Sequence, residues 1–409
     1  MKIRSITCFL NPGWPLEDER IQKAGQFLAE ARAAFEQEEY EVQTVRLATV
    51  PFPRLLSGHI EKEAVQLACE LEQQAKAAGF DYVSLGPALP EALESYAVIP
   101  DILVAAPATF LGGVMAEAQT GISLPAVRLC ARTIHDLAPL TPDGFTNLRF
   151  AALANVLPGS PFFPAAYHAG DEPAFALATE AGDLIVEAVS QAKSLEQARL
   201  RIVASLEEHS ARLTQVGEAL MKRFQVAFKG IDFSPAPFPS RERSLAEAAE
   251  RLGVPAVGLA GSLAGMAFLA ESLDRAQFPR TGFSGLMLPV LEDAVLAERA
   301  AQGSLTVTDL LLYSAVCGTG LDTIPLPGDV TVDQLSAILL DLAALAQRLD
   351  KPLTARLMPV PGKQAGDPTN FDFAFFANSR VMAIQAQPLT GMFSGEETFE
   401  LKARSKLRR

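Results

Sequence analysis

Segments with the pattern of buried strands alternate with long amphipathic helices along this chain. A strand is expected over residues 2–10, the turn Asn11-Pro12-Gly13 follows, and an amphipathic helix runs over about 16–38. Neighbouring parallel strands cannot be joined by tight turns, and they need crossover segments as long as these helices. The alternation therefore predicts an α/β fold with a largely parallel sheet.

The alternation extends over the chain and predicts roughly ten strands, which is more than an open sheet usually holds without curling or closing. After the first strand, further strands are expected at 42–48, 80–85, 173–178, 256–260, 285–290, 319–326, 353–359 and 381–385. Helices are expected at 60–78, 181–191, 194–228 and 332–349, from 262, up to 301 and from 307, and the region 109–156 is also expected to be helical. No linker divides these elements, so residues 1–409 are predicted to form one large domain.

Residues 194–228 carry the longest helical pattern. Its apolar side chains return every three or four residues, at Leu200, Val203, Leu206, Leu213, Val216 and Leu220. One face of this helix is therefore expected to be buried, either as a scaffold within the domain or as the contact of a homo-oligomer. The C-terminal stretch 395–409 ends in a run of lysines and arginines and is expected to be a flexible, solvated basic tail.

Charge and composition exclude several classes of function. The net charge is −13, whereas binding to a phosphate backbone needs a concentrated basic face, so nucleic acid is not an expected partner. Charged residues interrupt every long apolar stretch before membrane-spanning length, and the N-terminal apolar run is too short for a signal peptide. The cysteines, Cys8, Cys69, Cys130 and Cys317, have no metal-binding or disulfide spacing. A cytoplasmic protein without membrane contact is predicted.

Two polar loops of the C-terminal half carry side chains that suit binding. In Gly230-Ile-Asp232-Phe-Ser-Pro-Ala-Pro-Phe-Pro239, three prolines stiffen a loop that holds a carboxylate. Asp232 is interpreted either as a site residue or as the cap of an Asx turn, and both interpretations stay open. In Thr281-Gly-Phe-Ser284-Gly, the hydroxyl of Ser284 lies in a glycine-flanked turn. This frame is one residue short of the nucleophile elbow of hydrolases, and the expected strand follows it, so we exclude a hydrolase.

The third polar loop is Cys317-Gly-Thr-Gly-Leu-Asp322, with Pro327-Gly-Asp329 after it. A cysteine at a helix end, before two glycines, can present its sulfur to a ligand as nucleophile or acid. Most cysteines, however, are buried and inert, and nearby acids disfavour a thiolate. Asp322 is a candidate base. Asp322 and Asp329 also offer oxygens to a divalent metal ion such as Mg²⁺ or Ca²⁺, although their spacing matches no dedicated metal loop.

Three further residues are candidates for the walls of a ligand pocket. Arg356 and Lys363 suit an anionic group, because their charges pair with carboxylates and phosphates. His168 lies in a segment rich in glycine, proline and aromatic residues, 161–170, although a lone histidine is more often packed and hydrogen-bonded. The Gly- and Ala-rich segment 257–265 has neither the Walker A nor the dinucleotide-binding spacing, so no nucleotide motif is present.

Taken in order, these motifs resemble those of the bacterial and archaeal family known as domain of unknown function 711. The resemblance is specific over about 144–386, and Asn147 and the segment 161–170 share it, so Asn147 joins the candidate binding residues. The motifs that carry it are Asp232-Phe-Ser-Pro-Ala-Pro, Gly282-Phe-Ser-Gly, Cys317-Gly-Thr-Gly-Leu-Asp322, Pro327-Gly-Asp329 and Arg356-Leu-Met-Pro-Val-Pro-Gly-Lys363-Gln-Ala-Gly-Asp367.

The resemblance implies a fold like the ten-stranded α/β barrel of pyruvate formate-lyase-type glycyl radical enzymes, with outer helices and with Cys317 on a turn at the barrel centre. A glycyl radical needs a glycine in an Arg-Val-x-Gly-Tyr motif near the C-terminus. The corresponding stretch here, 372–381, contains no glycine. We therefore expect the fold without the radical, and fold alone does not carry function.

Two classes of function follow from these observations. The first is an enzyme that binds an anionic metabolite in a central pocket. Its catalytic candidates are Cys317, Asp322 and Asp232, and its binding candidates are Ser284, Arg356, Lys363, Asn147 and His168. The second is a ligand-binding or regulatory protein without catalysis. A closed pocket with two perturbed titratable groups favours the enzyme, and an open, merely polar cleft favours the binder.

Overall fold

The structure is a computed structural model that describes residues 1–404. Within these residues, eleven strands form one mixed sheet, and α-helices flank it. The strands are β1 (Lys2–Leu10), β2 (Val42–Thr49), β3 (Tyr82–Ser84), β4 (Thr109–Glu117), β5 (Gly121–Ser123), β6 (Phe150–Ala154), β7 (Ala174–Glu180), β8 (Ala227–Asp232), β9 (Gly320–Pro327), β10 (Leu353–Val360) and β11 (Thr398–Phe399). The helices are α1 (Asp18–Gln37), α2 (Phe52–Leu56), α3 (Ile60–Ala77), α4 (Glu94–Ala97), α5 (Ile99–Ala105), α6 (Leu124–Leu137), α7 (Gly182–Ser190), α8 (Leu195–Phe224), α9 (Leu245–Arg251), α10 (Ser262–Arg275), α11 (Ala294–Gln302), α12 (Val307–Ser314) and α13 (Val332–Leu349).

The main path of the sheet runs β8-β7-β1-β2-β3-β4-β6-β10-β9. Neighbours along it are parallel except at β7–β1 and β6–β10, which are antiparallel. The sheet is not closed into the barrel that was expected, and β8 and β9 are its two edges. The segment 280–289 runs between these edges, because Arg280 bridges to Ile231 in β8 and Pro289 bridges to Asp322 in β9.

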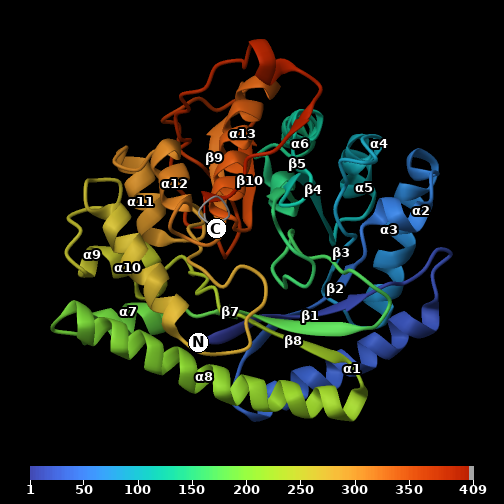
Figure 1. The fold of residues 1–409 in the computed structure, drawn as a ribbon, viewed down its shortest axis with the longest axis horizontal. Helices are drawn as coiled ribbons and strands as arrows, with labels where there is room; N and C mark the ends of the chain where they lie inside the picture. The colour runs from blue at the N-terminus through green and yellow to red at the C-terminus, as the bar shows by residue number, and fades with distance from the viewer. Residues whose placement is uncertain (405–409) are drawn as a thin grey trace.

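Helices and irregular segments cover opposite faces of the sheet. Figure 1 shows the helices around the rim of the molecule, with β1, β7 and β8 crossing the lower half and β4, β9 and β10 standing nearly upright. The largest apolar core lies between the sheet and these helices, and it includes Ile6, Leu47 and Ile324 from the strands. The opposite, inner face of the sheet is lined by smaller apolar clusters and by loops. A concave inner surface is thus formed by strands from both halves of the chain.

Side-chain caps explain where several of the predicted helices begin. The predicted helix 332–349 is confirmed as α13, which starts with a capping box in which Thr331 and Gln334 each accept from the other's backbone N–H. Thr306 and Asp309 form a second capping box at α12. Asp293 caps α11 by accepting from the backbone N–H groups of residues 295 and 296.

Several predicted elements differ from the structure. The region 109–156 is not all helix: it contains β4, β5 and β6 beside α6. These strands are buried on both faces, so their Gly- and Ala-rich sequences lack the alternation that marks a half-exposed strand. No strand forms at 256–260, 285–290 or 381–385 among the described residues. Strand β8 begins at Ala227, so its first two residues fall at the end of the stretch 194–228 that was predicted to be the long helix.

The long helix α8 spans Leu195–Phe224 and ends four residues before the predicted boundary, where Gln225 adopts a left-handed conformation. Its buried face contacts α7, α10, α1 and β8 of the same chain. Leu200, predicted on that face, is instead 60% exposed. In the part of the chain that the structure describes, no helix has the length and apolarity to cross a membrane.

The C-terminal stretch is attached to the sheet over its described part. Strand β11 pairs with β5 in antiparallel fashion, and Ala403 is buried. The guanidinium of Arg348 donates to the carbonyl of Lys402. Residues 395–404, expected to belong to a flexible tail, therefore pack against the domain, and residues 405–409 of that tail lie outside the described residues.

Candidate functional site

A cavity of about 750 Å³ lies on the inner face of the sheet. Strands β1, β2, β3, β4, β6, β9 and β10 all contribute side chains to it, and loops contribute the rest of its lining. Its charged lining residues are Arg4, Arg46, Asp81, Arg149, Glu292, Asp322 and Arg356, and its aromatic ones are Tyr82, Phe110, Phe145, Phe162, Phe163, Phe283, Phe373 and Phe375. The volume is in the range of cavities that hold small molecules.

A β-bulge directs Arg4 into this cavity. Between Ile3 and Ser5 the register of β1 against β7 shifts by one residue, so that Arg4 is the extra residue. Ile3 and Ile6 both belong to the helix-facing core, whereas the hydroxyl of Ser5 contacts the loop carbonyl of Pro161 on the inner side. Two successive polar residues of a buried strand thus face the inner surface.

A second bulge does the same for Asp322 in β9. Leu321 and Ile324 both face the helices. Leu321 pairs with Ala355 and Ile324 pairs with Leu357, so β9 has one residue more than β10 between these two pairs. Thr323, the residue after Asp322, has a φ of 43°, a left-handed conformation that is strained for a β-branched side chain. The strained bulge therefore holds Asp322 at the cavity wall.

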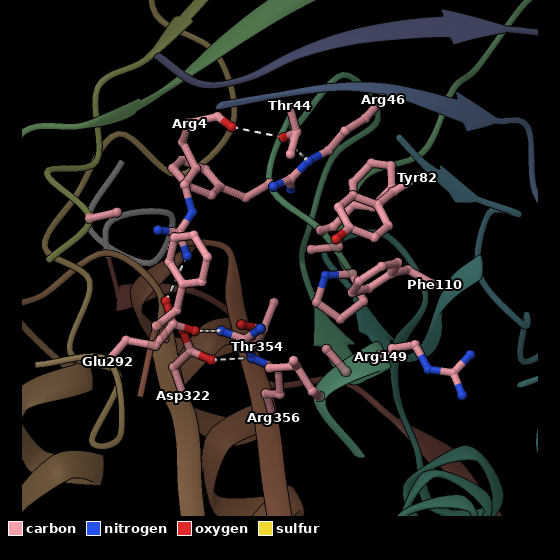
Figure 2. A pocket seen from close by; sticks show the side chains of 18 of the residues that line it. Arg4, Thr44, Arg46, Tyr82, Phe110, Arg149, Glu292, Asp322, Thr354 and Arg356 are labelled. Atoms are coloured by element: carbon pink, nitrogen blue, oxygen red, sulfur yellow. Dashed lines mark hydrogen bonds and ion pairs between the residues drawn. The ribbon is translucent and has the colours of Figure 1, made fainter. Parts of the chain in front are cut away.

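Ion pairs connect the two bulges through Glu292. Its two oxygens accept from Arg4 Nη2 at 2.9 Å and from Arg356 Nη2 at 2.8 Å, as Figure 2 shows. Arg356 Nε donates to Asp322 Oδ1 at 2.6 Å. At the other end, Arg4 Nη1 donates to Glu180, which also accepts from Arg243. Three arginines and three carboxylates therefore form one continuous, largely buried chain.

The carboxyl group of Asp322 keeps its proton more readily than an exposed aspartate. Burial raises its pKa, Arg356 acts in the opposite direction, and the negative charge of Glu292 adds to the rise. For Arg356, burial disfavours the charge, but Asp322 and Glu292 together raise its pKa above the usual value. Arg356 therefore stays charged, and Asp322 is the carboxyl group whose proton affinity this environment raises.

Among residues 1–404, no carboxylate forms an ion pair with Arg46. Its Nε donates to Thr44 Oγ1 at 2.8 Å, and Thr44 in turn donates to the backbone carbonyl of Arg4. Its guanidinium lies 5.0 Å from the ring centre of Phe163 and 5.9 Å from that of Tyr82. Burial and the charge of Arg4 lower its pKa to about 9, so it stays protonated at neutral pH. In Figure 2 it lies across the cavity from Asp322 and Arg356.

Arg149 serves a structural purpose. It donates to the carbonyls of Leu103 and Ala106 at the C-terminal end of α5 and of Thr109 at the start of β4, and in Figure 2 its guanidinium points away from the cavity. The cations that face the space are therefore Arg4, Arg46 and Arg356.

The predicted residues Asp232 and Ser284 lie together outside the cavity lining. The buried carboxylate of Asp232 accepts from the backbone N–H groups of Phe283 at 2.7 Å and Ser284 at 2.8 Å, and from both the N–H and the hydroxyl of Ser234. Burial raises the pKa of Asp232 to about 6, although these hydrogen bonds act in the opposite direction. A Cβ at Gly282 would collide with this carboxylate. These contacts match the Asx-turn interpretation of Asp232.

Cys317 is buried beneath the same loops and does not line the cavity. Its backbone carbonyl accepts from Lys351 Nζ, which also binds the carbonyl of Ser314 at 3.0 Å. The Cys317 loop and the Ser284 loop meet at Gly285 and Gly318, whose backbones touch so closely that a Cβ on either would overlap the other. The three predicted loops therefore converge, but only Asp322 among their predicted residues reaches the cavity.

The other predicted residues are dispersed. Lys363 lies in the turn after β10, where only its backbone makes contacts, to Val360 and Gly328. Asn147 lies in the 3₁₀ helix Phe145–Arg149, is fully buried, and has no partner for either polar atom of its amide. His168 lines a separate hollow of about 190 Å³. Burial and the nearby charge of Lys229 lower its pKa, and its Nε2 has no partner.

The residues do not support the predicted divalent-metal arrangement. Asp322 is held by Arg356, and Asp329 accepts from Gln364 at 3.0 Å. Among residues 1–404, no three His, Cys, Asp or Glu side chains are grouped as a metal ion would need.

Sequence reasoning missed Arg4, Arg46 and Glu292. The sequence signal that could have found such residues is a pair of polar residues inside an otherwise apolar strand. The same order of apolar, charged, hydroxyl and apolar residues occurs in Ile3-Arg4-Ser5-Ile6 and in Leu321-Asp322-Thr323-Ile324. Charged side chains are rarely buried without a partner or a ligand, so such pairs mark an inner surface.

Comparison with known proteins places the chain in a family. The family described as Uncharacterised ACR (DUF711) matches residues 1–378. A UPF0210 protein of Pyrobaculum arsenaticum is 35% identical and covers 80% of this chain and 75% of its own. UPF0210 proteins of Oenococcus oeni and Neisseria meningitidis are 27% and 28% identical, each over 86% of this chain and 81% of their own. The chain therefore belongs to the DUF711 family, whose members are uncharacterised.

Proposed function

We propose that this protein is an enzyme that binds a small anionic molecule in the cavity and transfers a proton to or from it through Asp322. The observation that carries the proposal is the cavity itself, which places a cation without a carboxylate partner, Arg46, opposite a carboxylate of raised pKa, Asp322.

Anion binding follows from the charge of Arg46. Burying a cation without an anion is unfavourable. The guanidinium group of Arg46 lines the cavity, where its N–H groups can donate to a ligand. A carboxylate or phosphate group would supply the missing charge through strong, charge-assisted hydrogen bonds. Arg356 and Arg4 are already paired, so they are less available to a ligand.

Proton transfer follows from the environment of Asp322. A general acid or base is most effective when its pKa lies near the working pH, and burial together with Glu292 moves Asp322 in that direction. The left-handed Thr323 beside it is the kind of strained backbone that is retained at functional positions. Two perturbed titratable groups in one cavity, Asp322 and Arg46, also favour an enzyme.

The proposed chemistry does not use a glycyl radical. The sulfur of Cys317 is buried away from the cavity, and the stretch 371–381, which carries Phe373 and Phe375 to the cavity, contains no glycine. We regard the open, curved sheet as a relative of the radical-enzyme barrel, with the segment 280–289 lying where the gap between β8 and β9 would close.

The alternative is a ligand-binding protein without catalysis. One observation favours it: Asp322 and Glu292 are both held by arginines, as in a rigid structural network. Assembly into a homo-oligomer and a cytoplasmic location stay predictions. The exposed Leu195 and Leu200 of α8 are where we would look for a contact between copies.

Turnover separates the two functions. Carboxylated and phosphorylated metabolites are screened by thermal shift, and each ligand found is then incubated with the protein in D₂O and followed by mass spectrometry. The enzyme proposal expects conversion or deuterium uptake, reduced about 100-fold or more in Asp322→Asn, which still binds. A ligand that binds through Arg46 but remains unchanged and unlabelled would leave the binding protein as the function.

A further inference from the structure

We infer that the ligand of this cavity is a monoanion with a flat apolar body, of the aryl carboxylate class. This inference rests on the proposed function and adds the class of molecule that the cavity recognises. It is drawn from two features of the lining, the balance of its charges and the arrangement of its aromatic rings.

The charges of the lining leave a single positive charge without a partner. Arg4, Arg243 and Arg356 balance Glu180, Glu292 and Asp322 within the continuous chain of ion pairs. Asp81, which also lines the cavity, pairs with Arg32, which does not. Arg46 alone faces the space without an anion, so one negative charge on the ligand completes the balance.

A second negative charge on the ligand would be unfavourable. Across the cavity from Arg46 stand Asp322 and Glu292, which already occupy the guanidinium groups of Arg4 and Arg356, and a dianion long enough to span the space would bring its second charge against these carboxylates. Like charges that are close together repel more strongly where water is partly excluded than in bulk water. This disfavours phosphate monoesters and dicarboxylates relative to monocarboxylates.

Aromatic rings form two walls around this charge. Tyr82, Phe110 and Phe163 form one wall beside Arg46, with ring centres 5.4 Å apart for both the Tyr82–Phe110 and the Phe110–Phe163 pairs. Phe145 and Phe373, whose centres are 5.1 Å apart, belong to the other wall. Aromatic faces and edges favour a flat ring between them over a flexible chain.

The test uses a series of ligands on the unmodified protein. Binding is measured by calorimetry for 2-naphthoate, its neutral amide 2-naphthamide, naphthalene-2,6-dicarboxylate, decanoate and inorganic phosphate. We expect 2-naphthoate to bind at least about tenfold more tightly than each of the other four, because only it combines one charge with a flat body. This comparison does not depend on the folding of any variant.

Variants then locate the contacts. Arg46→Gln should weaken 2-naphthoate at least about tenfold and leave 2-naphthamide unchanged. Phe373→Leu should weaken 2-naphthoate about 2- to 10-fold but not decanoate. The matched control is Arg132→Gln, which removes the charge of an exposed arginine on α6 and should change neither.

The outcomes separate this inference from the proposed function. If phosphate or the dicarboxylate binds more tightly than 2-naphthoate, and Arg46→Gln abolishes that binding, the aryl carboxylate class is wrong while anion binding at Arg46 stands. If decanoate binds as tightly as 2-naphthoate, the aromatic selectivity is wrong. If no anion binds more weakly to Arg46→Gln than to Arg132→Gln, both the inference and the proposed function fail.

Discussion

Arg356 and Asp322 lie side by side on the neighbouring strands β10 and β9, and the Nε of the arginine donates to the carboxylate at 2.6 Å. The same guanidinium holds Glu292. Replacing it would leave the buried carboxylate of Asp322 without a cation and Glu292 with Arg4 as its remaining partner. We predict that Arg356→Gln lowers the free energy of unfolding by about 3–5 kcal/mol, measured by urea denaturation.

The control is Arg128→Gln, which breaks the pair between Arg128 and the exposed Glu396. An exposed ion pair contributes at most about 1 kcal/mol. If Arg356→Gln costs no more than this control, the chain of ion pairs does not stabilise the fold as described.

A second prediction concerns the strained bulge of β9 at Thr323. Thr323 is left-handed, and its hydroxyl accepts only a long hydrogen bond, 3.3 Å, from the N–H of Leu291. Glycine adopts this conformation without strain. Thr323→Gly should therefore change the free energy of unfolding by less than about 1 kcal/mol, since relief of strain offsets the lost side chain.

Thr7 provides the comparison, because it is buried in β1 and donates to the carbonyl of Pro161 at 2.9 Å. Thr7→Gly should cost about 2 kcal/mol or more, from the lost hydrogen bond and the greater freedom of the unfolded chain. Equal costs for the two substitutions would show that the bulge is not strained.

A third prediction concerns the backbone contact between Gly285 and Gly318. A Cβ at Gly285 would overlap the backbone of Gly318, and backbone cannot move aside as a side chain does. Gly285→Ala should destabilise the protein by about 2–4 kcal/mol. Gly253→Ala, in open space at a φ of +113°, tests conformation alone and should cost about 1–2 kcal/mol. A smaller loss at Gly285 than at Gly253 would argue against the contact between the loops.

Stability should depend on pH through Asp232. Its pKa of about 6 in the folded protein lies above the ordinary value of 3.8, so between these values the folded state holds a proton that the unfolded state has released. The contribution of Asp232 to stability therefore falls as pH rises from about 4 to 6 and is constant above that.

Asp232→Asn tests this sign. The variant should be less stable by about 2 kcal/mol or more at pH 4, because its amide group meets the N–H of Phe283. Its deficit relative to the unmodified protein should shrink from pH 4 to 6 in chemical denaturation. A deficit that grows over this range would reverse the assigned shift.

The sequence predicted the elements whose signals are local. The helices α12 and α13 and the strands β1, β2, β9 and β10 were located because apolar pattern, turns and helix length are written in neighbouring residues. Strands β4 and β6 were missed because a strand buried on both faces has no alternation to distinguish it from a buried helix. Closure of the sheet depends on how distant edges meet, which no local pattern encodes.

The site was predicted in part for the same reason. Asp322 and Arg356 lie in sequence motifs that are recognisable without the structure, and both side chains line the cavity. Arg4 and Arg46 were overlooked because the face to which a strand residue points depends on register, and at Arg4 a bulge also reverses that face. Asp232 looked like a site residue because a buried carboxylate that orders a loop has the same sequence as one that binds a ligand.

The most direct test of the central claim is a crystal structure of the protein with the anion that binds most tightly in solution. The anionic group is predicted to lie within the cavity, at about 3 Å from the guanidinium nitrogens of Arg46, with the rest of the molecule between Phe163 and Asp322. An anion bound elsewhere, with the guanidinium of Arg46 directed at solvent or at a protein carboxylate, would contradict the assignment of this cavity as the functional site.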